Sequence, residues 1–146
     1  MAADDLLLRQ APHSPQAEQA VLGSMLIDPD CIKDVMDKLQ PEDFYLRANR
    51  DIFETIYHMF IYSRPIDGVT VAGEMERNGV YNDNTRDYLV QLMDVTPTSA
   101  NVMEYVKIVL DKSLMRQVAA AAGSITAMVQ EGNGDAGDML ESAEQK

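Results

Sequence analysis

The sequence is poor in several residue types, and each shortage narrows the functions it could have. Cys31 is the only cysteine, and there is no tryptophan. A single cysteine excludes an internal disulfide and any cysteine-based zinc cluster. No apolar run approaches the ~18 residues that a membrane-spanning helix needs, so we expect no membrane span. Residues 1–10 lack the basic and apolar regions of a secretory signal, and we therefore expect a cytoplasmic protein.

Basic residues are also scarce. Twelve Lys and Arg residues stand against 24 Asp and Glu residues, which gives a net charge of −12. A protein that binds nucleic acid through its phosphates needs clustered Lys and Arg side chains, whereas here they are scattered singly from Arg9 to Lys146. The acidity fits a soluble surface in general, and it also fits a domain that contacts other proteins. Both interpretations predict no direct binding to DNA.

Hydrophobic residues recur with helical spacing along almost the whole chain, and no stretch alternates as a half-buried strand would. The sequence therefore predicts an all-α fold. We expect residues 1–13 to form a flexible arm and residues 14–97 a compact head of about five short helices. A long helical hairpin is expected over residues 98–146. Local signals for helix starts and stops divide the head; they are Ser14-Pro15, Asp28-Pro29, Pro41, Ser63-Arg64-Pro65, Asp67, Gly79 and Pro97.

The predicted hairpin begins with a long helix. No proline interrupts residues 98–131, and Gly123 is the only glycine among them. A helix of this length measures roughly 50 Å, whereas a head of about 100 residues has a radius of gyration of about 13 Å. The helix must therefore extend past the head or bend near Ser113. After a turn at 132–134, Asp135 is predicted to cap the second arm. The helical period of the first arm is sustained by Val102, Val106, Val109, Leu114, Val118, Ala121, Ile125 and Met128.

The hairpin is also the candidate site of interaction. Two helical arms cannot bury two apolar stripes without a third surface, and the small side chains of residues 119–122 let another helix approach closely. We expect the chain to self-associate here. Folding of the hairpin back onto the head is the alternative, since helices often pack locally. The predicted interface comprises Val118, Ala119, Ala121, Ala122, Ile125, Met128, Val129, Met139, Leu140 and Ala143.

Motifs for catalysis, cofactors and metals are weak or missing. Residues 132–137 spell G-x-G-x-x-G, but they follow a predicted helix rather than a strand, so we interpret them as a turn and not as a dinucleotide site. No G-x-x-x-x-G-K-[ST] loop occurs, and we expect no nucleotide hydrolysis by this chain. Glu54 and His58 are spaced i, i+4, whereas di-iron bundles use Glu-x-x-His. We predict that His58 is a partly buried, hydrogen-bonded side chain and not a metal ligand.

No catalytic, cofactor-binding or metal-binding residue is therefore predicted. A small enzyme that uses carboxylates and a metal ion is the rival from another class, but the sequence offers no ligand set with the required spacing.

Seven blocks of the sequence, in order and with matching gaps, resemble the N-terminal domain of bacterial replicative DNA helicases of the DnaB family. Together they span nearly the whole chain from residue 12 onward. They are residues 14–26 (SPQAEQAVLGSML), 41–45 (PEDFY), 65–71 (PIDGVTV), 87–92 (DYLVQL), 96–102 (TPTSANV), 112–116 (KSLMR) and 143–146 (AEQK).

The resemblance implies a division of labour between domains. In this family the N-terminal domain is an all-α head with a helical hairpin. The hairpins pair, so that six subunits form a collar that is a trimer of dimers, and the C-terminal domain of primase docks on this collar. A linker joins it to a RecA-like motor domain, which uses ATP and Mg²⁺ to unwind duplex DNA at the replication fork. Because the sequence ends where the family's linker begins, we expect linker and motor to be absent from this chain. A stand-alone helical adaptor of the same fold is the alternative.

The chain departs from the family pattern at two places. Residues 84–87, Asn-Thr-Arg-Asp, stand where the family usually has a Gly-Gly pair before Tyr88 and Leu89, so the loop at 79–86 cannot be predicted by analogy. Asn49 lies near a position that is often histidine, which affects only the start of a helix.

Overall fold

The structure is a computed structural model that describes residues 11–132 and 134–145. All the regular secondary structure within these ranges is helical, which confirms the all-α prediction. The chain divides into two compact units: His13–Ser113 forms one, and Pro12 with the residues from Leu114 onward belongs to the other. Residues 1–10 of the predicted arm lie outside the described residues.

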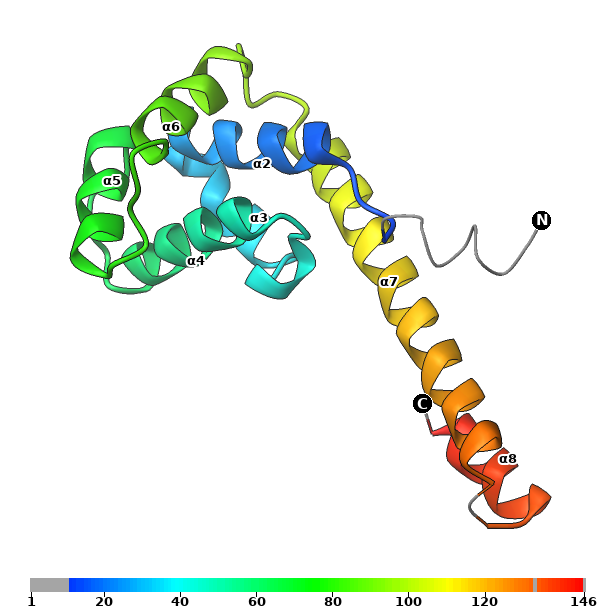
Figure 1. Cartoon of the computed structure of the whole chain (residues 1–146). Helices are drawn as coiled ribbons and strands as arrows, with labels where there is room; N and C mark the ends of the chain where they lie inside the picture. The colour runs from blue at the N-terminus through cyan, green and yellow to red at the C-terminus, as the bar shows by residue number, and fades with distance from the viewer. Residues whose placement is uncertain (1–10, 133, 146) are drawn as a thin grey trace. The chain divides into compact units, whose positions relative to one another are not determined.

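The head has five short α-helices, as the sequence predicts, and two short 3₁₀ helices between them (Figure 1). At the predicted first start, Ala17 N donates to Ser14 Oγ at 3.2 Å. At the predicted fourth start, Thr70 N donates to Asp67 Oδ1 at 2.8 Å and Asp67 N donates to Thr70 Oγ1 at 2.9 Å. Such caps satisfy amide groups that a helix start leaves unpaired. The elements are α2 (Pro15–Ile27), η1 (Pro29–Cys31), α3 (Ile32–Met36), η2 (Pro41–Asp43), α4 (Arg47–Ile61), α5 (Gly68–Arg77) and α6 (Thr85–Asp94).

The core of the head lies where α2 packs against α6 and α4. Gly23 in α2 marks the closest approach to α6. A Cβ atom there would overlap the Leu92 carbonyl oxygen and the Thr96 side chain, so only glycine fits. The largest fully buried apolar side chains of the head are Leu22, Met25, Ile32, Leu39, Phe44, Ile52, Phe53, Ile56, Met59, Leu89 and Leu92.

The long helix α7 (Val102–Glu131) is unbroken at Ser113, and its first turns belong to the head. Ser113 is buried and donates from Oγ to Asp43 Oδ1 at 2.7 Å. The compact unit therefore reaches Ser113, beyond residue 97, where the sequence places the end of the head. Leu114, which the periodicity includes in the apolar row, is instead 47% exposed. The buried valines of α7 are Val102, Val106 and Val109.

A buried carboxylate connects three helices of the head. Glu18, in α2, is only 1% exposed. Its Oε2 accepts a hydrogen bond from Tyr45 N at 2.9 Å, and its Oε1 accepts from Leu46 N at 3.3 Å and from Asn49 Nδ2 at 2.9 Å. The Tyr88 hydroxyl of α6 donates to Asn49 Oδ1. Because Leu46 gives α4 no side-chain cap, Glu18 supplies the acceptor for the start of α4 from another helix.

The loop at 79–86 is closed by local hydrogen bonds. Gly79 has φ of 75°, the left-handed conformation predicted for the residue after a helix end. Val80 N donates to Met75 O at 3.0 Å, which closes the end of α5. Asn82 N donates to Thr85 Oγ1 at 2.9 Å, at the start of α6. Thr85 thus organises the segment in which the chain lacks the family's Gly-Gly pair.

The second unit contains the later part of α7 and the helix α8 (Ala136–Glu144), which together make the predicted hairpin (Figure 1). Gly132 and Gly134 have φ of 66° and 80°, so both adopt left-handed turn conformations. Asp138 N donates to Asp135 Oδ1 at 2.8 Å, which confirms Asp135 as the cap of α8. The glycine-rich stretch therefore follows the helix α7, and its residues 136 and 137 begin α8, so it does not follow a strand as a dinucleotide site would.

Candidate functional site

The candidate interface lies on the hairpin, and half of its predicted residues form an inner row. Ala121, Ile125 and Met128 are half-buried and follow the spacing i, i+4, i+7, which places them on one face of α7. On α8, Met139 and Ala143 are half-buried at i and i+4. This pattern indicates the faces that the two helices of the hairpin turn toward each other.

The other predicted residues form an outer face, which we define as Val118, Ala119, Ala122, Val129 and Leu140. Val118 is 70% exposed, Val129 is 60% exposed and Leu140 is 64% exposed. The two alanines are exposed as well. The structure therefore divides the predicted interface into an inner row that α7 and α8 cover and an outer face that they leave open. Contact of this face with a partner stays a prediction.

Two further exposed apolar residues of the same unit are absent from the predicted interface. Leu114 is 47% exposed and Met115 is 51% exposed. The sequence did contain a signal for Leu114, because Ser113, and not Leu114, continues the four-residue step from the buried Val109. A polar side chain at that step can be buried when a partner such as Asp43 accepts its hydrogen bond.

The charge of the hairpin is negative. Between Leu114 and Gln145 the carboxylates are those of Glu131, Asp135, Asp138, Glu141 and Glu144, whereas the only basic residue is Arg116. The Arg116 guanidinium donates from Nη1 to the Pro12 carbonyl oxygen at 2.8 Å. A surface of this charge repels phosphates, so the outer face suits a protein and not a nucleic acid.

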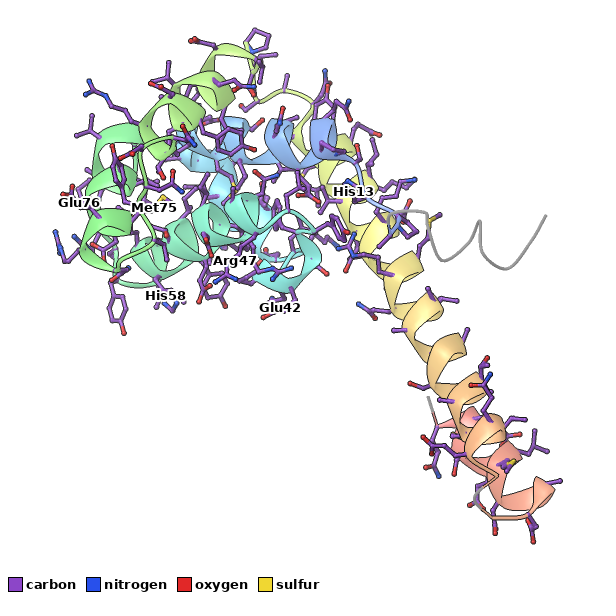
Figure 2. The ribbon with its side chains drawn as sticks, in the orientation of Figure 1. His13, Glu42, Arg47, His58, Met75 and Glu76 are labelled. Atoms are coloured by element: carbon purple, nitrogen blue, oxygen red, sulfur yellow. The ribbon has the colours of Figure 1, made fainter. Side chains whose placement is uncertain are left out.

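The residues that the sequence singled out for possible chemistry do not assemble into a reactive site. Glu54 Oε1 lies 3.7 Å from His58 Nε2, but the His58 side chain is 58% exposed. The prediction that His58 is partly buried is therefore wrong, because α4 turns Ile52, Ile56 and Met59 inward and leaves His58 outside (Figure 2). Among residues 11–132 and 134–145, no three His, Cys, Asp or Glu side chains converge as metal ligands.

The buried Cys31 is poorly suited to act as a nucleophile. Burial, together with the nearby Asp28 carboxylate, raises the pKa of the Cys31 thiol from 9.0 to about 11. The thiolate, which is the reactive form, is thus disfavoured at neutral pH. Within the described parts of the chain, no helix is long and apolar enough to cross a membrane.

Residues 10–111 match the family model described as the DnaB-like helicase N terminal domain. The chain is 38% identical over 125 residues to the replicative DNA helicase DnaB of Mycobacterium leprae (strain TN), which covers 85% of this chain and 20% of that protein. It is 31% identical over 137 residues to the same protein of Leifsonia xyli subsp. xyli, covering 93% of this chain and 30% of that protein. The chain is 38% identical over 118 residues to DnaB of Geobacillus stearothermophilus, and this match covers 80% of this chain and 26% of that protein. The matched region is thus at most 30% of the length of these relatives.

Two solved structures share the fold. The N-terminal domain of DnaB helicase from Mycobacterium tuberculosis has a TM-score of 0.86 and 34% identity, covering 93% of this chain and 96% of that chain. The N-terminal domain of DnaB helicase from Helicobacter pylori, described with its interactions with primase, has a TM-score of 0.68 and 22% identity. This match covers 89% of this chain and 99% of that chain. The second likeness concerns the fold alone. The family match over more than half of the sequence, together with the all-α head and hairpin, places this chain in the family of DnaB-like helicase N-terminal domains.

Proposed function

We propose that this chain is the oligomerisation and primase-docking domain of a hexameric replicative DNA helicase, which unwinds duplex DNA at the bacterial replication fork with ATP and Mg²⁺. In this proposal the chain contributes to the collar, and a separate motor domain binds nucleotide and DNA. The observation that carries it is the outer face of the hairpin, with Val118, Val129 and Leu140 each at least 60% exposed. Apolar surface of this kind commonly marks a protein–protein contact.

Self-association is supported by the chemistry of the outer face. Valine and leucine side chains that leave water at an interface contribute roughly 25 cal/mol per Å² of apolar surface buried. Ala119 and Ala122 have small side chains, so a second helix can come close to the backbone of α7. A pair of identical hairpins related by a two-fold axis would cover the part of this face at Val118, Ala119 and Ala122 on both copies at once, and would leave the part at Val129 and Leu140 open.

Primase docking is supported by the likeness to the Helicobacter pylori domain, which is described with its interactions with primase, and by the hairpin's acidic and apolar surface. A protein partner can pair Lys and Arg side chains with the carboxylates of α8 while its apolar residues contact Leu140. We assign this contact to the same outer face, at the turn-proximal end that carries Val129.

The docking proposal is tested by calorimetric titration with the C-terminal domain of a bacterial primase. Replacing Val129 and Leu140 together by Glu should weaken binding by about tenfold or more, because the charges enter a desolvated contact. Val69→Glu is the matched control, since Val69 is 83% exposed on α5 and lies outside the hairpin. Full affinity in the double variant, or equal loss in the control, would contradict the assignment.

A further inference from the structure

A groove crosses one face of the head, between α4, α5 and the start of α6. It consists of two adjoining hollows of about 580 Å³ and about 470 Å³, which share Asp51 and Val80 in their walls. One hollow is lined by His58 of α4 and the other by Met75 of α5, both labelled in Figure 2. The proposed self-association and primase docking use neither hollow.

Apolar side chains form part of the lining of the groove. Met59 and Met75 line it and are at most 3% exposed, while Val80 is 37% exposed and Tyr62 is 73% exposed at its edges. Methionine side chains are unbranched and polarisable. The exposed Val80 lies in both hollows beside the buried Met75, so an apolar side chain from another molecule could lie over these two residues.

The rim of the groove is acidic. Asp51, Glu54 and Asp87 line it, together with Glu74. Glu74 is held by Arg64 Nη1 at 2.7 Å and is also contacted by Arg77. In the part of the chain that the structure describes, Asp51 and Asp87 form no ion pair within 4 Å with Lys, Arg or His. The groove therefore offers two carboxylates, Asp51 from α4 and Asp87 from α6, to a cationic partner.

We propose that this groove binds a basic amphipathic segment of a different protein, with a bulky apolar side chain over Val80 and Met75 and with Lys or Arg side chains at Asp51, Glu54 and Asp87. Complementary charge would select this partner and speed its encounter with the acidic chain. The same carboxylates repel the phosphates of nucleic acid. A second copy of this chain, with its net charge of −12, is a poor electrostatic match for an acidic rim. The surface is additional to the hairpin function and does not rest on it.

The test uses the whole chain and a fluorescein-labelled helical peptide of about fifteen residues, with leucines along one face and lysines flanking them. A twin peptide carries Glu at every Lys position. We expect the basic peptide to bind at least about tenfold more tightly than its twin in fluorescence anisotropy. Combining Asp51→Lys with Asp87→Lys should weaken binding of the basic peptide by about tenfold or more.

The control separates this groove from general attraction to an acidic protein. Glu42→Lys combined with Glu104→Lys changes the net charge by the same amount, and both residues are exposed and lie outside the groove. This control should keep the affinity within about twofold, since distant exposed charges are screened by salt. Equal loss in both double variants, or equal binding of the two peptides, would overturn the proposal.

Methyl NMR on the unmodified chain locates the contact without any substitution. With the methionine methyl groups labelled, the basic peptide should shift the signals of Met59 and Met75 and leave those of Met115 and Met139 in place. Shifts confined to Met115 and Met139 would place the peptide on the hairpin and overturn the proposal. Light scattering gives a further check. If the unmodified chain did not bind the peptide, and the Asp51→Lys, Asp87→Lys variant had a lower mass than the unmodified chain, the groove would join copies of this chain. That result would overturn the proposal as well.

Discussion

At the scale of single residues, Glu18 determines how α4 begins. Its carboxylate is 1% exposed and accepts hydrogen bonds from Tyr45 N, Leu46 N and the Asn49 side chain. The Asn49 side chain is buried, and a buried donor left unsatisfied costs roughly 1–3 kcal/mol. Glu18 therefore contributes to stability through the groups it satisfies and less through its own charge.

We expect Glu18→Ala to lower the free energy of unfolding by about 3–5 kcal/mol, because it leaves buried donors unpaired and opens a cavity. Glu18→Gln should cost less, since one amide oxygen still accepts. Urea denaturation followed by circular dichroism measures both. Glu42→Ala, at an exposed carboxylate, should change stability by no more than about 0.5 kcal/mol. A similar small effect at Glu18 would show that its hydrogen bonds are replaceable by water.

A second prediction concerns Cys31 and alkaline pH. Its thiol has a folded-state pKa of about 11 against an ordinary value of 9.0, so the native state keeps this proton more tightly than the unfolded chain. The contribution of the Cys31 thiol to the free energy of unfolding is fully present below pH 9 and is lost as the pH rises through about 11. In urea unfolding across this range, Cys31→Ala should show a shallower fall in stability than the unmodified chain. Parallel pH profiles would contradict the assignment.

At the scale of elements, the local signals of the sequence predicted the helix starts well. Ser14 and Asp67 cap α2 and α5 as expected. The start of α4 could not be predicted in this way, because its acceptor, Glu18, lies 27 residues before Tyr45 in the sequence. Spacing alone also could not tell which apolar residues of the hairpin face α8 and which face outward. It placed Ile125 and Val118 in one stripe, although only Ile125 is half-buried.

Replacing a glycine by alanine should have opposite effects on stability in two of the helices. At Gly23 a Cβ would meet the Leu92 carbonyl oxygen and the Thr96 side chain, so α2 and α6 would have to separate. At Gly123, within α7, a Cβ would meet nothing within 4 Å. Gly23→Ala should therefore destabilise by about 1–3 kcal/mol or more, whereas Gly123→Ala should stabilise by about 0.5–1 kcal/mol. Thermal unfolding compares the two, and a stabilised Gly23→Ala variant would contradict the packing described.

At the scale of the whole molecule, acidity and exposed apolar surface together suggest a domain that contacts proteins. The net charge of −12 disfavours binding to phosphates. The exposed apolar side chains of the outer face, and Tyr62 and Val80 of the groove on the head, are available for protein partners. The fold and the family could be predicted from the sequence, since the helix signals are local and the matching blocks are spread along the chain. The division of the hairpin into an inner row and an outer face required the structure.

The central claim, that the outer face of the hairpin joins copies of this chain, is tested most directly by size-exclusion chromatography with light scattering. The unmodified chain, of 16.2 kDa, should elute as a dimer or larger assembly. Val118→Glu should shift it to the monomer mass, because the new charge would lie in the contact. Val69→Glu, at the exposed α5 position, should keep the assembly. A monomeric unmodified chain, or a Val118→Glu variant of unchanged mass, would contradict the claim.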